Sequence, residues 1–304
     1  QTRAAAITDP QLAPALVKAV KAKKVVDLSV LNARHLPVHW GGAGVGNYAF
    51  PFMQVKEVID YDGPAAQYWV GTQIMDSRTG THITPPAHYG LPHGFTINQY
   101  QGDIRTWAQQ FEKDFGKIQS TNMTSDRVPV SQMVGPARVI NVQDLVGTTD
   151  PGTWPAAPAI LPAHIQTYEN MHGDIEGGEV VIFHTGHTDA HFLAPKRGRM
   201  EMVMKAPLDG ASEGWPSPTP ETIRYLAERG VRHVAIDAPS MGSVDPKAAA
   251  MTHWAAANAG MIFTEFLINV GALPAKGAFY IFLNPKIENN HGGPGRAIAI
   301  LPHG

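Results

Sequence analysis

The chain has 304 residues, of which 43% are hydrophobic and 16% charged, enough apolar side chains to bury a sizeable core in one large domain. Lys and Arg number 24 against 26 Asp and Glu, which gives a formal net charge of -2 with the histidines neutral. Because nucleic-acid-binding domains carry clustered basic charge, this balance gives no basis for a DNA or RNA partner and favours a small-molecule substrate.

The chain contains no cysteine. Disulfides, thiolate nucleophiles and cysteine-based zinc sites are therefore excluded, and any metal has to be bound by His, Asp or Glu. No apolar run reaches the roughly 18 residues of a membrane-spanning helix, and the most apolar stretch, residues 260–270, contains Glu265. The sequence thus predicts no membrane partner. It begins at Gln1 rather than at a methionine, which favours a periplasmic or secreted location over a cytoplasmic one.

The first half of the chain alternates predicted helices and strands. Residues 9–22 carry apolar residues at helical spacing and lead into a strand at residues 25–31. The glycine-rich residues 41–47 lack the full GxGxxG spacing and follow no convincing strand, which indicates a loop rather than a phosphate site. A second helix is predicted over residues 103–118, where one face holds Ile104, Trp107, Phe111, Phe115 and Ile118. Such a stripe is typical of a helix packed on the core.

The second half has a clearer order of elements. The pattern predicts strands at residues 179–183, 231–236, 278–283 and 297–301, and helices at residues 217–230 and 246–258. Thr219 is the expected cap of the first of these helices and Gly230 its end. Helices and strands are mixed throughout, so the fold class is α/β. No linker separates independent units, which predicts a single domain over residues 1–304 with an insertion around residues 91–135.

The densest group of chemically active residues is TGTHITPPAHYG at residues 79–90. His82 and His88 lie six residues apart with Pro85 and Pro86 between them, so they cannot share a helix face. Prolines fix the backbone and reduce the entropy lost when a ligand is held, which suits a preformed metal or catalytic site. Two hydrogen-bonded loop histidines are the alternative interpretation.

His253 and Glu265 occur far downstream in MTHWAAANAGMIFTEFL, a stretch that is otherwise apolar and alanine-rich. Burying a carboxylate without a partner costs several kcal/mol, so Glu265 is expected to meet a metal, a histidine or an arginine. A structural ion pair would satisfy the same requirement.

These motifs together resemble a known family. GTH and PPAH within residues 80–88 are similar to the HxGTHxDxPxH signature of the cyclase and kynurenine formamidase superfamily. Further motifs follow in the family's order: DLS at 27–29, HTG at 184–186, GVRHVAIDAPS at 230–240, His253 with Glu265 twelve residues later, NPK at 284–286 and GGPGRAIAI at 292–300. The resemblance covers most of the chain, and the length matches longer members such as isatin hydrolases and trans-dienelactone hydrolases. It implies a mixed-sheet swivelling β/β/α fold with an inserted helical segment.

Carried over residue by residue, the resemblance implies that His82, His88, His253 and Glu265 bind metal. Glu265 and His253 are candidates for metal ligation or for proton transfer, and the sequence does not separate these roles. Such imidazole and carboxylate ligands suit zinc, the first choice here, and also accept manganese or iron.

Two positions depart from the family pattern. Arg78 stands where the family has its first histidine, and Thr84 stands where it has the aspartate that bridges two metals. A site that lacks one ligand and the bridge is expected to hold one divalent metal. The permanent charge of Arg78 then supplies part of the electrostatic role of the missing ion, which makes it a third catalytic candidate.

Substrate-binding residues are less well defined. Trp40, Tyr89 and Phe95 lie near family positions that line the pocket and could stack on a flat ring, although aromatic residues near a loop often serve only packing. His187, in HTGHTDAH at residues 184–191, could approach the substrate from the end of a strand, or could be a surface histidine. Neither interpretation is excluded by the sequence.

The predicted function is therefore hydrolysis of a cyclic amide or lactone, or of a related amide or ester, by metal-activated water. One alternative is an arylformamidase that acts on an N-formyl aromatic amine. A second is a non-catalytic small-molecule binding protein with a degenerate metal site. The expected assembly is a homodimer or homotetramer.

Overall fold

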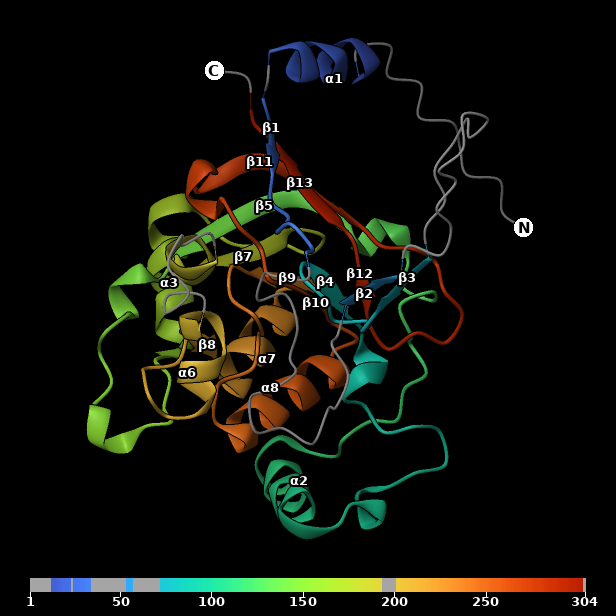
Figure 1. Ribbon diagram of the computed structural model, residues 1–304, viewed down its shortest axis with the longest axis vertical. Coiled ribbons are helices and arrows are strands. Elements are labelled where there is room, and N and C mark those ends of the chain that lie inside the picture. Colours follow the sequence, from blue (N-terminus) through green and yellow to red (C-terminus); the bar gives the residue numbers. More distant parts are fainter. Residues whose placement is uncertain (1–11, 23, 34–52, 57–71, 193–200, 303–304) are drawn as a thin grey trace.

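The computed structural model describes residues 12–22, 24–33, 53–56, 72–192 and 201–302. Its centre is a nine-stranded mixed sheet with the strand order β1-β13-β11-β5-β7-β9-β10-β4-β12 (Figure 1). In that order the strands are Val25–Asp27, Arg296–Ile300, Lys276–Leu283, Val134–Asn141, Val180–His184, His233–Ile236, Ile262–Glu265, His82–Thr84 and Gly293–Pro294. The predicted α/β class and curled mixed sheet are confirmed.

Four neighbouring strands of this sheet, β5, β7, β9 and β10, run parallel. Parallel neighbours need crossover connections, and these contain α3 (Pro162–His172), α7 (Pro220–Glu228) and α8 (Pro246–Asn258). The remaining described pairs in the sheet are antiparallel. The carboxyl ends of the four parallel strands therefore meet at one edge of the sheet, where α/β proteins commonly bind ligands.

Alternation along the strands divides the interior into two cores. In β7, Val181 and Phe183 pack against the helices, whereas Val180 and Ile182 face the inner side of the curled sheet. Because both faces are covered, this strand is a continuous apolar run.

Helix α2 (Gly102–Phe115) lies outside α8, at the end of the molecule away from α1 (Figure 1). It is held there by the buried Ala108 and Phe111, and the Phe111 ring lies 5.6 Å from that of Trp254 on α8. The helix begins and ends close to the predicted bounds, and its chain leaves the helix through Gly116 at φ 88°. The apolar stripe is thus packed on the body of the protein, as its spacing predicted.

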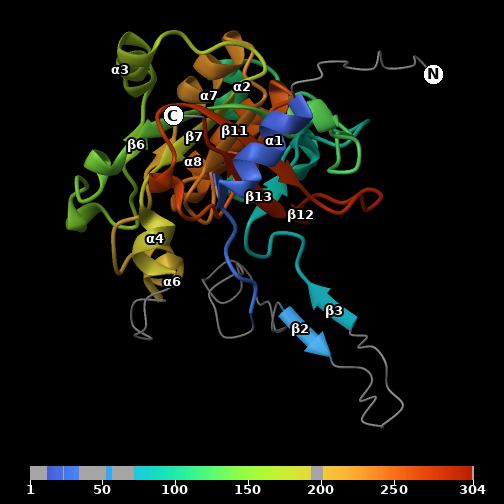
Figure 2. The ribbon, with the colours of Figure 1, turned by 90° about the horizontal axis from the view of Figure 1, so that it is seen from above.

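The other elements are short or lie at the periphery. They are α1 (Leu12–Lys21), α4 (His187–His191), α6 (Lys205–Leu208), and the strand pairs β2 (Met53–Lys56) with β3 (Thr72–Met75) and β6 (Ala159–Ile160) with β8 (Ser217–Pro218). Figure 2 shows the β2–β3 ribbon apart from the main sheet. Among the described residues, no helix is both long and apolar enough to cross a membrane.

Candidate active site

The centre of the candidate site is the junction of β10 and β4. These strands are antiparallel neighbours, and their register sets Glu265, the last residue of β10, directly opposite His82, the first residue of β4. Side chains alternate along a strand, so Ile83 enters the inner core while His82 and Thr84 point to the opposite face. Phe263, two residues before Glu265, packs in the helix-side core. His82, Thr84 and Glu265 therefore all face α8.

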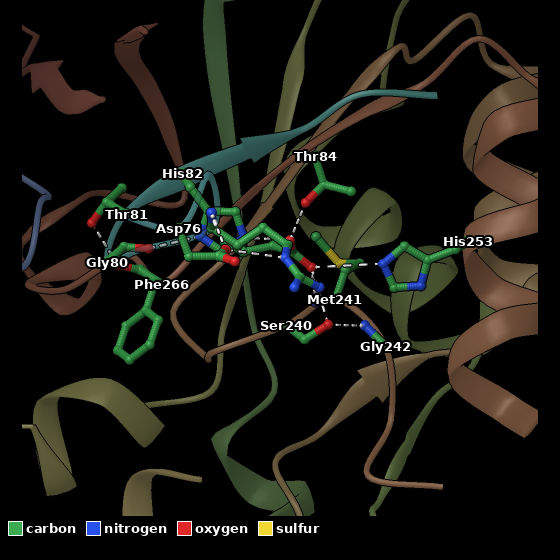
Figure 3. Close-up of polar contacts among 12 residues, drawn as sticks. Asp76, Gly80, Thr81, His82, Thr84, Ser240, Met241, Gly242, His253 and Phe266 are labelled. Carbon is green, nitrogen blue, oxygen red and sulfur yellow. Dashed lines mark hydrogen bonds and ion pairs between the residues drawn. The ribbon is translucent and has the colours of Figure 1, made fainter. Parts of the chain in front are cut away.

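Helix α8 brings His253 to the same place. The Asp245 side chain caps the helix by accepting from Ala248 N at 2.7 Å, and Pro246 occupies its first turn. His253 is buried, and Figure 3 shows its ring approaching the β4 side chains from the opposite side. A Cβ at Gly242 would lie 2.9 Å from His253 Cε1. Glycine at this position is thus what allows the loop after β9 to pass so close to the imidazole.

The carboxylate of Glu265 is buried and receives three hydrogen bonds. Ser240 Oγ donates to Oε1 at 3.1 Å and Met241 N donates to it at 2.5 Å, while the Thr84 hydroxyl donates to Oε2. Burial alone raises the pKa of a carboxyl group, but the two neighbouring histidines and the Thr84 hydroxyl outweigh it and hold the pKa of Glu265 below its usual range. The site consequently contains one buried negative charge at neutral pH.

Both histidines direct the same ring nitrogen to this charge. His82 Nδ1 lies 2.7 Å from Gly80 O, and His253 Nδ1 lies 2.7 Å from Ala249 O. A carbonyl oxygen only accepts, so each Nδ1 carries a proton. Nε2 then carries either a second proton, which makes the ring a cation, or a lone pair that a metal can use. His82 Nε2 is 3.1 Å from Glu265 Oε2, and His253 Nε2 is 3.9 Å from Oε1. Lone pairs facing a carboxylate require a proton or a metal cation to be stable.

His88 and Arg78 complete the polar part of the site. Burial above all, together with the nearby charges of His253 and Arg78, lowers the pKa of His88 to about 3, so its ring is neutral at physiological pH. The Tyr89 ring stacks on that of His253 with 4.3 Å between centroids. Arg78 is partly exposed, and Asp76 Oδ1 accepts from its backbone N at 2.8 Å and lies 3.4 Å from its Nε. The Asp76 carboxylate therefore fixes the turn that presents the guanidinium.

The donor set fits a divalent cation in its chemistry. Within the described part of the chain, no three His, Asp or Glu side chains already surround a common metal position. However, His82 Nε2 is buried and has no hydrogen-bond partner of acceptable geometry, although it lies beside a carboxylate. The backbone carbonyls that hold Nδ1 of His82 and His253 are the partners that metal-ligating histidines commonly have. Two oriented imidazoles and an ionised carboxylate are suitable ligands for zinc or manganese.

These side chains open onto one cavity of about 240 Å³. Its polar end contains Arg78, His82, His88, Ser240, His253 and Glu265, and the rest of its lining is Tyr89, Ile104, Trp107, Leu208, Ser243, Val244, Pro246, Ala249 and Ala250. All four sequence-predicted metal ligands, Arg78 and Tyr89 are therefore brought together. The cavity combines an apolar wall with convergent polar groups, which is typical of small-molecule sites.

Two predicted substrate-binding residues, Phe95 and His187, do not line this cavity. Phe95 is 50% exposed and does not line the cavity. His187 is buried elsewhere, with Nε2 at 2.9 Å from Val203 O and its ring against Trp215. Trp40 lies outside the described residues. A substrate contact by any of these three stays a prediction.

Sequence reasoning missed some contributors. Ser240 and the backbone N of Met241 bind Glu265 from the loop after β9, although the sequence analysis had quoted Ser240 only as part of a family motif. Ile104 and Trp107 were assigned to packing alone, yet they line the cavity. The signal for Ser240 was its place four residues beyond the predicted strand that ends at Ile236, since loops of this kind carry functional groups in α/β folds.

The fold and the cavity define an α/β protein whose candidate active site lies at the carboxyl edge of its parallel strands. The chain belongs to the cyclase family, whose model matches residues 26–243. It is similar to the isatin hydrolase of Roseibium aggregatum, with 25% identity over 257 residues that cover 83% of this chain and 82% of the relative. It is also similar to the kynurenine formamidase of Salinibacter ruber, with 24% identity over 235 residues, covering 75% and 78% of the two chains.

Solved structures agree on the fold. Isatin hydrolase A from Labrenzia aggregata superimposes with a TM-score of 0.71 at 24% identity, covering 96% of this chain and 100% of the other. A structure described as a predicted metal-dependent hydrolase from Bacillus stearothermophilus has a TM-score of 0.55 at 19% identity, with 90% and 97% covered. The named relatives are hydrolases, which supports an enzyme.

Proposed function

We propose that this protein is a hydrolase that opens a cyclic amide or lactone, or cleaves a related amide or ester, with the help of one divalent metal, zinc ahead of manganese. The observation that carries the proposal is the buried Glu265 carboxylate with His82 Nε2 at 3.1 Å and His253 Nε2 at 3.9 Å from its oxygens, while a backbone carbonyl holds Nδ1 of each ring. This arrangement is stabilised by a cation. It is supported by the relatives named isatin hydrolase and kynurenine formamidase, which act on amide-type bonds.

His82, His253 and Glu265 would hold the metal, with His88 at the same cavity. When bound, such an ion lowers the pKa of a coordinated water to about 7 and polarises a carbonyl group. The hydrogen bonds from Ser240, Met241 and Thr84 keep Glu265 ionised and occupy its oxygens. We therefore assign Glu265 the role of a metal ligand rather than that of a group that transfers a proton.

Arg78 would act on the substrate. Arg78 lines the cavity together with His82 and is held by Asp76. A fixed positive charge there stabilises the negative charge that develops on a carbonyl oxygen when water adds to it. The ring of His88, which burial keeps neutral, would offer the metal a further imidazole ligand in the same cavity.

The test is metal content combined with activity. Purified protein is analysed for transition metals, dialysed against a chelator, and assayed with zinc or manganese on cyclic amides, lactones and formanilides. About one equivalent of metal and metal-dependent hydrolysis of a cyclic substrate are expected. Protein with less than about a tenth of an equivalent of any metal, and with no activity restored by addition, would indicate a binding protein instead.

The same panel tests the arylformamidase alternative, which the 24% identity to a kynurenine formamidase favours. A preference for formanilides over every lactone and cyclic amide would establish this alternative. The two activities share the cavity and its metal-binding residues, so only the substrate preference separates them.

A further inference from the structure

The apolar end of the cavity is formed by elements that lie outside the nine-stranded sheet. Ile104 and Trp107 come from α2 and Leu208 from α6, and they face the start of α8. On α8, Ala249 and Ala250 precede His253 by about one turn and leave space beside it. A substrate group that extends away from the polar end must therefore fit between α2 and α8.

The apolar stripe of α2 serves two purposes along its length. Its first half places Ile104 and Trp107 at the cavity. Its second half places Phe111 and Phe115 over α7 and α8, where Phe115 also lies under the Arg224 guanidinium at 5.7 Å. Ala108 and Phe111 are almost fully buried and Trp107 is only partly buried. Ala108 and Phe111 thus anchor the helix, while Trp107 packs partly against the same core and also lines the cavity.

The size of the cavity limits what can bind. An apolar cavity of roughly 150 Å³ is enough to hold benzene, and sites for drug-sized ligands begin at roughly 300 Å³. The cavity bounded by the described residues, at about 240 Å³, fits one ring with a small substituent. A longer substituent needs more space than this, and Trp107 has the largest side chain of the lining.

We propose that Trp107 is a specificity-determining residue that restricts the substrate to a single ring with a short substituent by closing the apolar end of the cavity. This inference rests on the proposed function for the identity of the scissile bond, but not for the size limit. Trp107 lies on α2, within the segment predicted from the sequence as an insertion. Substrate size is then set by a helix that supplies none of the proposed metal ligands.

Two series of compounds test the proposal. The first is a binding series, benzoate and 4-butylbenzoate, titrated calorimetrically into the metal-loaded and metal-free protein. The second is a kinetic series of γ-lactones whose alkyl substituent grows from methyl to hexyl. The variants are Trp107→Ala, Trp107→Leu and the matched control Phe115→Ala, which lies on the same stripe outside the cavity.

Trp107→Ala is expected to improve binding of 4-butylbenzoate relative to benzoate by roughly tenfold or more, because discrimination by a tight apolar pocket is of that order. For the γ-lactones with longer substituents, Trp107→Ala should lower KM and leave kcat little changed. Trp107→Leu, which keeps an apolar residue against the core, should show a smaller change in the same direction. Phe115→Ala should leave both ratios unchanged.

An unchanged ratio of the two affinities in both Trp107 variants, or an equal change in Phe115→Ala, would overturn the proposal. The binding series does not depend on hydrolysis. If wild-type protein cleaves no lactone or amide but Trp107→Ala still widens the binding preference, the proposed function fails and the size limit stands. If lactones are cleaved with the same size dependence in all variants, the function stands and the role of Trp107 fails.

Discussion

His82 and Glu265 face each other across the β4–β10 pair, with Nε2 of the histidine 3.1 Å from Oε2 of the carboxylate. The Nδ1 proton of His82 is committed to Gly80 O. The short distance therefore places a lone pair against a negative oxygen unless a cation lies between them or the ring is doubly protonated. The register of β4 against β10 is therefore essential to the site, because a shift of one residue would turn His82 to the other face of the sheet, away from Glu265.

The first prediction concerns the stabilisation that metal provides. Zinc at about 100 times its dissociation constant should raise the free energy of unfolding by about 2.7 kcal/mol, since a ligand that binds only the folded state stabilises it by mass action. His253→Ala should lose this increment, as should His88→Ala. His187→Ala is the matched control, because His187 is also a buried histidine but lies outside the cavity. Urea denaturation with and without zinc measures the increment, and its full retention in His253→Ala would contradict the ligand assignment.

A second prediction concerns the Thr84 hydroxyl, which donates to Glu265 Oε2. Thr84→Val keeps the shape of the side chain but leaves a buried charged oxygen with one donor fewer, which should cost roughly 1.5–3 kcal/mol in the metal-free protein. Thr84→Ser keeps the hydroxyl and should cost clearly less. Equilibrium urea unfolding compares the two variants. Equal stability of Thr84→Val and wild-type protein would mean that the hydroxyl does not support the carboxylate.

The parts of the fold that sequence predicted well are those with local signals. Helix α8 has the predicted bounds, and its start is set by Asp245 and Pro246, which act within one turn of the helix. Helix α7 has the predicted cap, Thr219, but it begins at Pro220 rather than at Ser217, because Ser217 and Pro218 pair with β6 as strand β8. Capping and proline effects depend on residues a few positions apart, so a single sequence contains them.

The candidate site depends on pairing between distant segments, which the pattern of one sequence does not contain. Thr84 and Glu265 are 181 positions apart, and nothing in either segment indicates that β4 and β10 are neighbours or in which register. Family resemblance, rather than periodicity, had grouped His82, His88, His253 and Glu265. The same resemblance gave no information on Trp107. Whether its side chain lines the cavity depends on how α2 packs on α8. Strand β5 and helix α3 were not predicted at all, although β5 is central to the sheet.

A third prediction is a loss of stability in mild acid from His233, which lies outside the cavity. His233 is buried with Nδ1 3.0 Å from Gln132 O and Nε2 2.7 Å from Thr264 Oγ1, and burial lowers its pKa to about 3. The unfolded chain titrates near 6.5. Neutral His233 therefore contributes fully to the stability of the folded protein above pH 6.5. This contribution is lost as the pH falls towards 3, because the histidine takes up a proton in the unfolded chain before it does so in the folded protein.

The slope from this one histidine should approach about 1.4 kcal/mol per pH unit between pH 6 and 4. His233→Gln should lower the slope of unfolding free energy against pH by that amount, whatever its effect on stability at pH 8. His93→Gln, at an exposed position, should leave the slope unchanged. Identical slopes for wild-type protein and His233→Gln would show that His233 does not resist protonation in the folded state.

A fourth prediction tests the charge of Arg78 separately from metal binding. Arg78→Ala should lower kcat/KM by roughly a hundredfold, or about 3 kcal/mol of transition-state stabilisation, with metal content unchanged. Arg78→Lys should recover only part of this loss, because lysine keeps the charge but not the planar pair of donors that can grip an oxygen. Arg105→Ala, an exposed arginine on α2, is the control for a general effect of lost charge. Full activity in Arg78→Ala would mean that the guanidinium does not contribute to catalysis.

The last prediction reverses both departures from the family pattern at once. The double variant Arg78→His with Thr84→Asp rebuilds the family's ligand set, in which a histidine and a bridging aspartate would replace a guanidinium and a hydroxyl. Both wild-type residues work against a second metal, since the guanidinium repels a cation and the Thr84 hydroxyl donates to Glu265 Oε2.

Metal stoichiometry measured by mass spectrometry should therefore rise from about one towards two in the double variant. Each single variant should stay near one, because Arg78→His leaves the site without its bridge and Thr84→Asp places a second carboxylate beside Glu265 with Arg78 still present. Two metals in wild-type protein would refute the single-metal argument. A double variant that binds no more metal than wild type would show that the carboxylate and imidazole at these positions cannot reach a shared ion, despite the register that sets residue 84 on the same face as His82.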